Sequence, residues 1–250
     1  MKIVAVFMLL AAVTHDSHAS NVNNFKDDLV TTFVSRAAGD KIKDLLEKFK
    51  EIMRNGNETK GIPKLDPLSW NHKEISINDE LLKAKGEVNN LYVEGLSDYI
   101  VDYAEFKFAK MNLSIALTWS RIKGDTLYDI IAAKIMDFIP IFGKGNATLE
   151  VENLKFSTNI LINIQNKKLY LTQFVNTKIS LHNLKLNAQG LYENEEFSEF
   201  LSAVISNIAP EGLNDLQEEI VTRVDNMMLE MGNEILKNFD FDDILGILKP

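Results

Sequence analysis

The amino-acid sequence predicts an α+β fold in which a highly curved antiparallel β-sheet wraps a long helix, with a second long helix near the C-terminus. Three observations support this prediction. An amphipathic stretch without proline occupies residues 25–53, segments with apolar residues at alternate positions fill the middle of the chain, and helical spacing returns after residue 195. Long helices that bracket many strands are typical of the α+β class.

The first helix is expected from Phe25 to Met53, where apolar residues recur three or four positions apart and charged residues fill the other face. Gly39 weakens its middle, since glycine is a poor helix former, and Asn55-Gly56-Asn57 ends it. Such a helix is not stable alone. The sheet is therefore expected to bury its apolar residues, which are Phe25, Leu29, Phe33, Ile42, Leu45, Leu46, Phe49 and Ile52.

The strands are expected to follow the segment Gly61–Leu68, where Pro63 and Pro67 forbid a helix. The clearest alternation covers residues 112–122. Its apolar face consists of Leu113, Ile115, Leu117 and Trp119. Turns are predicted at residues 123–125, at 166–168 and, because of its two glycines, over residues 142–148.

The end of the chain is expected to form two helices. The first covers Glu195–Ile208 and ends at Ala209-Pro210, and the second runs from Leu213 to about Asn238. An apolar tail, Phe239–Leu248, follows. No linker rich in glycine, serine or proline interrupts the sequence, so residues 20–250 are predicted to form one domain.

Residues 1–19 read as a secretory signal peptide, with a charged start, an apolar run from Ile3 to Val13 and the small-residue site Ser17-His18-Ala19. No later apolar run is long enough to span a bilayer, which predicts a secreted, extracellular protein. Glycosylation sequons begin at Asn57, Asn112 and Asn146, and Asn57 is favoured because its loop is polar.

Composition excludes several functions. The formal charge is −9 and the lysines are dispersed, so no basic stripe for nucleic acid is present. The chain has no cysteine, which excludes thiol catalysis and cysteine-bound zinc. Outside the leader, the histidines are His72 and His182, and they show no metal-ligand spacing. A Gly-x-Ser-x-Gly motif is absent, and Gly143-Lys144-Gly145 lacks the ending of a phosphate loop. We predict no catalysis, no metal and no cofactor.

The chain does carry many large apolar side chains around Pro140 and on the last helix. A sheet curled round a helix can leave an apolar tunnel, and methionines line adaptable sites for apolar ligands. The hydrophobic pocket is predicted to be lined by Ile115, Leu117, Trp119, Tyr128, Ile135, Phe138, Phe142, Phe156, Met227 and Met231.

Three segments resemble the insect takeout and haemolymph juvenile-hormone-binding protein family. They are Gly61–Leu68 (GIPKLDPL), Gly95-Leu96-Ser97 and Ile139–Gly145 (IPIFGKG), in the family's order. The resemblance implies a curved sheet around a long helix, and a tunnel for a terpenoid hormone, fatty acid or similar lipid. That fold belongs with the tubular lipid-binding proteins, and mite group-7 allergens look like further relatives.

The chain departs from the family pattern because members usually carry a cysteine pair near the mature N-terminus. The takeout-like and allergen-like branches therefore both remain open. Two functions follow. The first is a secreted carrier of a small hydrophobic ligand. The alternative is an extracellular interaction protein that recognises a receptor or a bacterial lipid through exposed apolar surface, such as Phe239–Leu248. The sequence does not indicate the oligomeric state.

Overall fold

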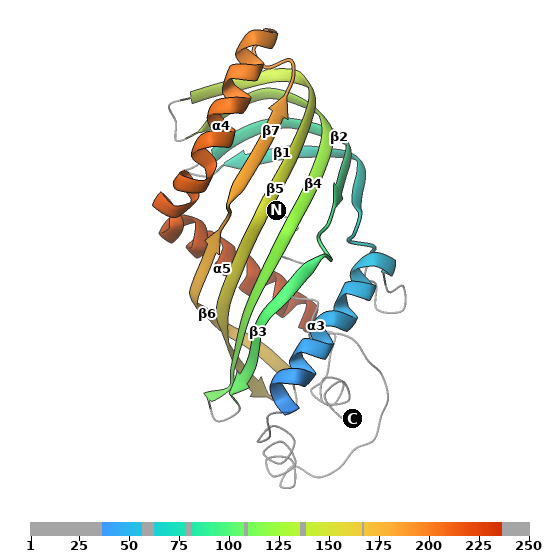
Figure 1. The fold of residues 1–250 in the computed structure, drawn as a ribbon, viewed down its shortest axis with the longest axis vertical. Coiled ribbons are helices and arrows are strands. Elements are labelled where there is room, and N and C mark those ends of the chain that lie inside the picture. The colour runs from blue at the N-terminus through green and yellow to red at the C-terminus, as the bar shows by residue number, and fades with distance from the viewer. Residues whose placement is uncertain are drawn as a thin grey trace.

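The computed structural model describes residues 37–56, 63–78, 82–107, 110–135, 139–166 and 168–236. Three helices and seven strands lie within these ranges (Figure 1). The leader, residues 25–36 of the first predicted helix and the apolar tail lie outside them. The elements are α3 (Ala37–Asn55), β1 (Leu68–Asn78), β2 (Leu82–Glu94), β3 (Tyr99–Lys107), β4 (Asn112–Ile135), β5 (Ile139–Gln165), β6 (Lys168–Ser180), β7 (Asn183–Ala188), α4 (Glu195–Asp215) and α5 (Gln217–Leu236).

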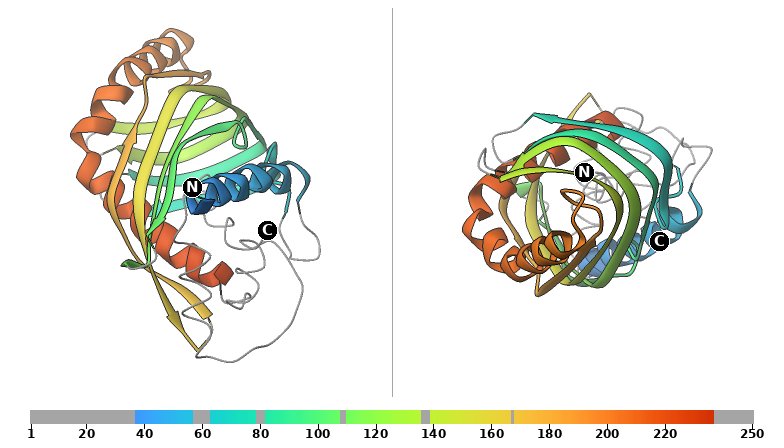
Figure 2. Two further views of the ribbon diagram at one scale, coloured as in Figure 1. Left: turned by 60° about the horizontal axis from the view of Figure 1, so that its bottom comes forward. Right: turned by 90° about the horizontal axis from the view of Figure 1, so that it is seen from above.

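Two long strands, β4 and β5, pair antiparallel along nearly their whole length and form the spine of the sheet. Each changes its second neighbour part-way along. The first half of β4 pairs with β3 and its second half with β2, while β5 pairs first with β7 and then with β6. The sheet is strongly curved, as the view from above shows (Figure 2). The predicted α+β fold with a large curved antiparallel sheet is confirmed.

The predicted turn at residues 123–125 is wrong, because this segment lies inside β4. Gly124 stands opposite Val93 on one side and Leu149 on the other. A Cβ at Gly124 would lie 3.4 Å from Cγ2 of Val93, an ordinary van der Waals distance, so Gly124 occupies a regular strand position and not a chain reversal. The reversal predicted at 166–168 is confirmed, since β5 ends at Gln165 and β6 begins at Lys168.

The predicted turn over residues 142–148 is also wrong, because these residues belong to β5. Two of its glycines, Gly143 and Gly145, allow the backbone at residues 189–190 to approach β5 closely. A Cβ at Gly145 would lie 2.0 Å from the carbonyl oxygen of Gln189, and one at Gly143 would lie 2.4 Å from that of Gly190. The chain after β7 therefore continues against β5, with the amide of Gln189 donating to the carbonyl of Asn146 at 2.9 Å.

The helices agree with the prediction in type but not in every boundary. The described part of the first helix is helical as predicted. The end predicted at Ala209-Pro210 is wrong, because α4 continues through Pro210 to Asp215. A proline inside a helix removes one hydrogen bond. Here α4 is held to the sheet upstream of Pro210, and Gln217 bonds to β6 downstream of it, so the helix persists.

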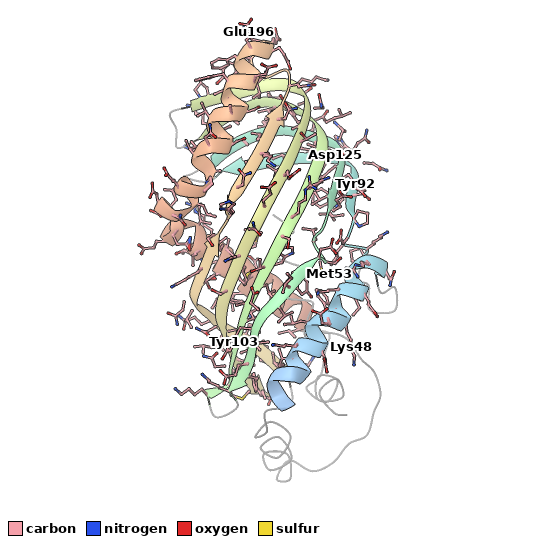
Figure 3. All side chains as sticks on the ribbon, in the orientation of Figure 1. Lys48, Met53, Tyr92, Tyr103, Asp125 and Glu196 are labelled. Atoms are coloured by element: carbon pink, nitrogen blue, oxygen red, sulfur yellow. The ribbon has the colours of Figure 1, made fainter. Side chains whose placement is uncertain are left out.

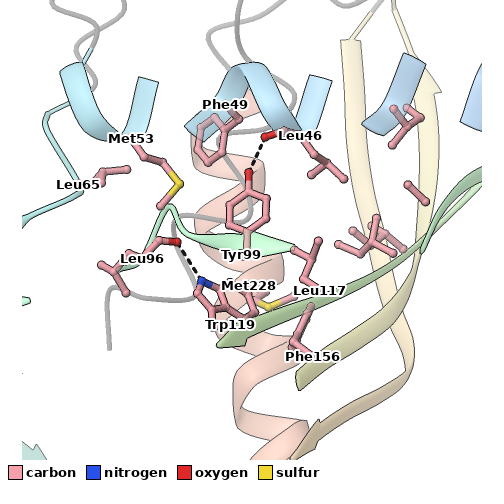
Figure 4. Packing of buried hydrophobic residues seen from close by; sticks show 14 of the residues in the cluster. Leu46, Phe49, Met53, Leu65, Leu96, Tyr99, Leu117, Trp119, Phe156 and Met228 are labelled. Atoms are coloured by element: carbon pink, nitrogen blue, oxygen red, sulfur yellow. Dashed lines mark hydrogen bonds between the residues drawn. The ribbon is translucent and has the colours of Figure 1, made fainter. Parts of the chain in front are cut away.

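The principal core lies where α3 and α5 pack against the part of the sheet built from β3, β4, β5 and β6 (Figure 4). Trp119 and Tyr99 meet edge to face, with ring centroids 5.7 Å apart. Both polar atoms bond to main-chain carbonyls. The Tyr99 hydroxyl donates to Leu46 at 2.6 Å, and the Trp119 Nε1–H donates to Leu96 at 2.9 Å. Burial raises the pKa of Tyr99, so the hydroxyl stays a donor.

Asp66 joins the first helix to the turn before β3, and its carboxylate and the main chain make different parts of this link. The carboxylate accepts hydrogen bonds from the amides of Gly95 (3.0 Å) and Ser97 (2.7 Å) and from the Ser97 hydroxyl (2.6 Å). The amides of Leu65 and Asp66 donate to the carbonyl of Met53 near the end of α3, at 2.8 and 2.9 Å. The segment before β1 therefore holds the turn before β3 through the buried side chain of Asp66, and the end of α3 through its own main chain.

The free edge of β7 and β6 is covered by side chains from the two C-terminal helices. Ser198, Ser202 and Ser206 of α4 accept hydrogen bonds from amides along the edge at 2.8–3.0 Å. Further along, Gln217 bonds to both the amide and the carbonyl of Ile179, and Asn233 of α5 does the same for Leu171. Side-chain polar groups thus replace a missing strand.

We expect Asp66→Asn to destabilise the fold by about 3 kcal/mol, because the amide nitrogen would face buried donors that now bind a carboxylate. Urea unfolding measures the loss. Asp98→Asn is the matched control, since Asp98 lies in the same turn but pairs with Arg54 at the surface and its loss should cost less than about 1 kcal/mol. Equal losses in the two variants would contradict the role given to Asp66.

We expect Asn233→Ala to cost about 1–3 kcal/mol, because it leaves the amide and the carbonyl of Leu171 without their partner. Hydrogen exchange of the Leu171 amide should accelerate. Thr222→Ala, an exposed change on the same helix, is the control. Unchanged exchange at Leu171 would show that the edge does not depend on this amide.

Candidate functional site

The candidate site is an apolar surface on the concave face of β2, β4, β5 and β7, which we call the apolar wall. Register places its residues in cross-strand rows: Val88 opposite Tyr128, Gly124 opposite Leu149, and Leu149 opposite Leu186. Residues directly opposite each other point to the same face of a sheet. The wall consists of Val88, Tyr128, Ile130, Ala147, Leu149 and Leu186.

The apolar wall is much less filled than the principal core. Within its cluster the buried residues are Tyr128, Ala188 and Leu191, while Val88, Ile130, Ala147 and Leu186 are only half-buried. Leu149 keeps 39% of its surface exposed although its row faces inward. Of the described helices, α3 packs on β3 and α5 on β6, away from the wall, while α4 packs along β7 and covers one end of the wall with Leu201. This part of the concave face can therefore accept an apolar ligand.

One end of the wall is fixed by Tyr128. Its hydroxyl donates to the carbonyl of Gln189 at 2.5 Å. Gly145 stands opposite Tyr128 in register, and without a side chain it leaves the ring room to reach across β5. Burial raises the pKa of Tyr128, so the hydroxyl remains protonated and holds this bond. The wall thus offers apolar contact and little free hydrogen-bonding capacity.

The ten residues predicted to line the pocket fall into separate groups. Ile115, Leu117, Trp119 and Phe156 lie together in the principal core, where α3 and α5 cover them. Tyr128 lies in the apolar wall. Met227 is half-buried on α5, and Phe142 is 43% exposed, with its ring 4.5 Å from that of Tyr192. Phe138 and the side chains of Ile135 and Met231 lie outside the described residues.

Sequence reasoning did not select most of the wall. The reason is a change of inward parity between Trp119 and Ile122, which are both buried although three positions apart. On the partner strand Asn153 has a positive φ of 50° at this point. The usable signal was the spacing of Gly143, Gly145 and Ala147, which places three small residues on one face of a strand.

The other predicted sites lie at the surface or outside the described residues. Asn146 is exposed on β5, Asn112 is half-buried at the start of β4, and Asn57 is not described. His72 is exposed on β1, where its Nδ1 lies 2.8 Å from the side-chain oxygen of Asn89. Within the described ranges, no three His, Cys, Asp or Glu side chains are grouped to hold a metal ion. None of the described helices could cross a bilayer.

A short polar chain runs into the interior beside the principal core. The buried hydroxyls of Thr158 and Thr177 lie 2.7 Å apart, and that of Thr177 donates to Oδ1 of Asp225 on α5 at 2.7 Å. Burial raises the pKa of Asp225, and the hydrogen bond from Thr177 opposes this shift in part. The chain gives α5 a fixed polar contact with β6.

Comparison of the chain with known proteins identifies its family. A family model described as haemolymph juvenile hormone binding protein (JHBP) matches residues 8–246. The chain belongs to this family. Two of the segments whose sequence resembles the family meet in the described structure, because Asp66 of the first accepts hydrogen bonds from Gly95 and Ser97 of the second. No curated protein matches the chain.

Among solved structures, the chain resembles Takeout 1 of Epiphyas postvittana with a TM-score of 0.57 and 12% identity, over 80% of this chain and 93% of that one. The likeness shows a shared fold. Lipopolysaccharide binding protein aligns with a TM-score of 0.33 and 11% identity, over 81% of this chain and 38% of that one, which is too weak to show a shared fold.

We expect the stabilising effect of Asp225→Asn to depend on pH. Since the folded protein raises the pKa of this carboxyl, it binds the proton more tightly than the unfolded chain does. The stability from the protonated group is fully present below the unfolded pKa and is lost as pH rises through the folded pKa. The variant avoids this loss, so its urea midpoint should gain more over wild type near pH 7 than near pH 4.

Asp215→Asn, an exposed change at the end of α4, is the control for the general effect of removing one negative charge. A gain for Asp225→Asn that did not change with pH would show that the half-buried Asp225 carboxyl titrates as it does in the unfolded chain.

Proposed function

We propose that this chain is a secreted carrier that holds a small hydrophobic ligand, of the terpenoid or fatty-acid class, against the apolar wall and performs no catalysis. Membership of the JHBP family supports a hydrophobic ligand, as the family's description names a hormone-binding protein. The leader-like residues 1–19 and the sequon at the exposed Asn146 support export.

The observation that carries the proposal is the contrast between the two parts of the concave face. One part is filled by α3 and α5, whereas the apolar wall leaves side chains such as Leu149 partly uncovered on an inward face. Solvating such a surface is unfavourable, and an apolar ligand removes the cost. A ligand that lost about 300 Å² of accessible surface would gain roughly 7.5 kcal/mol before the costs of association.

The wall also favours this ligand class over a polar one. The hydroxyl of Tyr128 is already engaged with Gln189, and the other wall residues are aliphatic. A polar ligand would lose hydrogen bonds to water without replacing them there. The alternative of a receptor-binding tail concerns residues outside the described ranges and stays a prediction.

Native mass spectrometry of the secreted protein, before and after solvent extraction, tests the proposal. We expect a discrete bound mass that extraction removes and that an offered fatty acid or terpenoid restores. Ala147→Trp should lower ligand occupancy by at least about tenfold, because the indole would fill the space above the wall, a loss of roughly 1.4 kcal/mol or more in binding.

Leu127→Trp is the matched control, because Leu127 neighbours the same row but is exposed on the opposite face of the sheet. It should bind ligand as wild type does, and thermal unfolding should show both variants folded. A protein that carries nothing and takes up no offered lipid would overturn the carrier proposal.

A further inference from the structure

The outer face of the sheet holds a groove made of two adjoining hollows of about 490 and 480 Å³. Both hollows are lined by Tyr92, Glu94 and Lys123, so they adjoin at these three residues. One extends towards Arg54 at the end of α3, and the other extends across β5 to Lys185 on β7. We call the whole feature the outer groove.

Register places the charged side chains of the outer groove and the side chains of the apolar wall on opposite faces of the sheet. Glu94 stands opposite Lys123, and Lys123 opposite Glu150. The next row along these strands places Val93 opposite Gly124 and Gly124 opposite Leu149, which belong to the concave face. Since neighbouring residues of a strand point to opposite faces, the charged row faces outward. The charged side chains of the outer groove therefore point away from the apolar wall, although the second hollow also borders on Gly124, Leu149 and Leu186 of the wall rows.

Most charges in the outer groove already have partners. Arg54 donates to the Ser97 hydroxyl and to Asp98, each at 2.9 Å. Arg121 donates to Glu150 at 2.6 Å. Lys185 donates to Glu152 at 2.6 Å, and this bond lowers the pKa of that carboxyl to about 2. These charges are neutralised where they stand.

Three charges in the middle of the outer groove are not engaged in this way. Lys123 is half-buried, and the described residues provide it with no ion pair. Glu94 receives one long hydrogen bond, from the Tyr92 hydroxyl at 3.4 Å. Asp125 is exposed directly opposite Tyr92 in register, and the described residues give it no hydrogen-bond donor. Figure 3 shows Tyr92 and Asp125 close together where β2 meets β4.

We propose that the outer groove binds a zwitterionic head group in which a short linker joins an ammonium to a phosphate, as in phosphocholine. In this proposal the ligand's ammonium group lies on the ring of Tyr92, which is 40% exposed and flanked by the carboxylates of Glu94 and Asp125. Aromatic faces attract quaternary ammonium groups, and nearby carboxylates add to the attraction. The ligand's phosphate group accepts hydrogen bonds from the side-chain Nζ of Lys123.

The spacing of these residues fits such a ligand. Tyr92 and Lys123 are diagonal neighbours across β2 and β4, and diagonal neighbours on a sheet face lie about 7–8 Å apart. The ligand's two charged groups can each contact one of them while the short linker crosses between. A plain anion would instead meet two carboxylates, and a plain cation would meet Lys123, so the groove favours a ligand that carries both charges.

Calorimetric titration of the full chain with free phosphocholine tests the proposal. We expect saturable one-to-one binding, with choline alone and inorganic phosphate alone each at least about tenfold weaker. Phosphate that bound as tightly as phosphocholine would show a simple anion site, and no binding of phosphocholine in either free or lipid form would overturn the proposal.

Two variants locate the site. Tyr92→Ala and Lys123→Gln should each weaken phosphocholine binding by at least about tenfold. The controls are Tyr103→Ala and Lys107→Gln on β3. There the same tyrosine–glutamate spacing recurs, but Lys107 is paired with Glu105 at 3.0 Å. Controls that weakened binding as much as the groove variants would place the ligand elsewhere.

Vesicles of phosphatidylcholine distinguish the source of the head group. If the wild-type protein sediments with the vesicles and the Lys123→Gln variant does not, the groove binds a lipid surface. If the protein binds free phosphocholine but does not sediment with vesicles, the groove binds a soluble ligand. Native mass spectrometry of Lys123→Gln separates this proposal from the carrier function, because the interior ligand should be retained when the outer groove is disabled.

Discussion

The buried carboxylate of Asp66 is the interaction on which the placement of the first helix depends. It binds the turn that precedes β3, while the main chain beside it binds Met53 in the last turn of α3. The hydrogen bonds that the two core aromatic residues make to main-chain carbonyls depend on this placement. Tyr99 reaches the carbonyl of Leu46 and Trp119 reaches that of Leu96 only when helix and turn are held in this relation. A desolvated anion with three donors is a strong directional constraint.

That placement divides the concave face into two parts with different properties. Where α3 and α5 lie, side chains interdigitate and little surface remains, so this part supplies stability. Where they do not lie, the apolar wall remains half-covered. The outer face of the same strands is charged and hydrogen-bonded across rows. A single sheet therefore separates an apolar compartment from a polar surface by the thickness of one strand layer.

Much of this fold could be predicted from the periodicity of apolar residues and from the order of the helical and strand segments along the chain. Alternation over residues 112–122 correctly placed Leu117 and Trp119 on the inner face, and helical spacing identified both C-terminal helices. Chain reversals were harder to predict, because Gly124 lies within β4 and Gly145 allows the backbone at Gln189 to approach β5, and such glycines look like turn residues in a sequence. The apolar wall was missed since register across four strands, which one sequence does not encode locally, decides its members.

The helical cover of β6 and β7 also limits how this protein can meet other chains. An uncovered strand edge is a template for pairing with another chain and for aggregation. Here serine, glutamine and asparagine side chains occupy the amides and carbonyls that such pairing would use. Strand addition at this edge would require α4 and α5 to detach. Partners must accordingly be recognised by side chains on the faces of the sheet and helices, and not by extension of the sheet across β6 and β7.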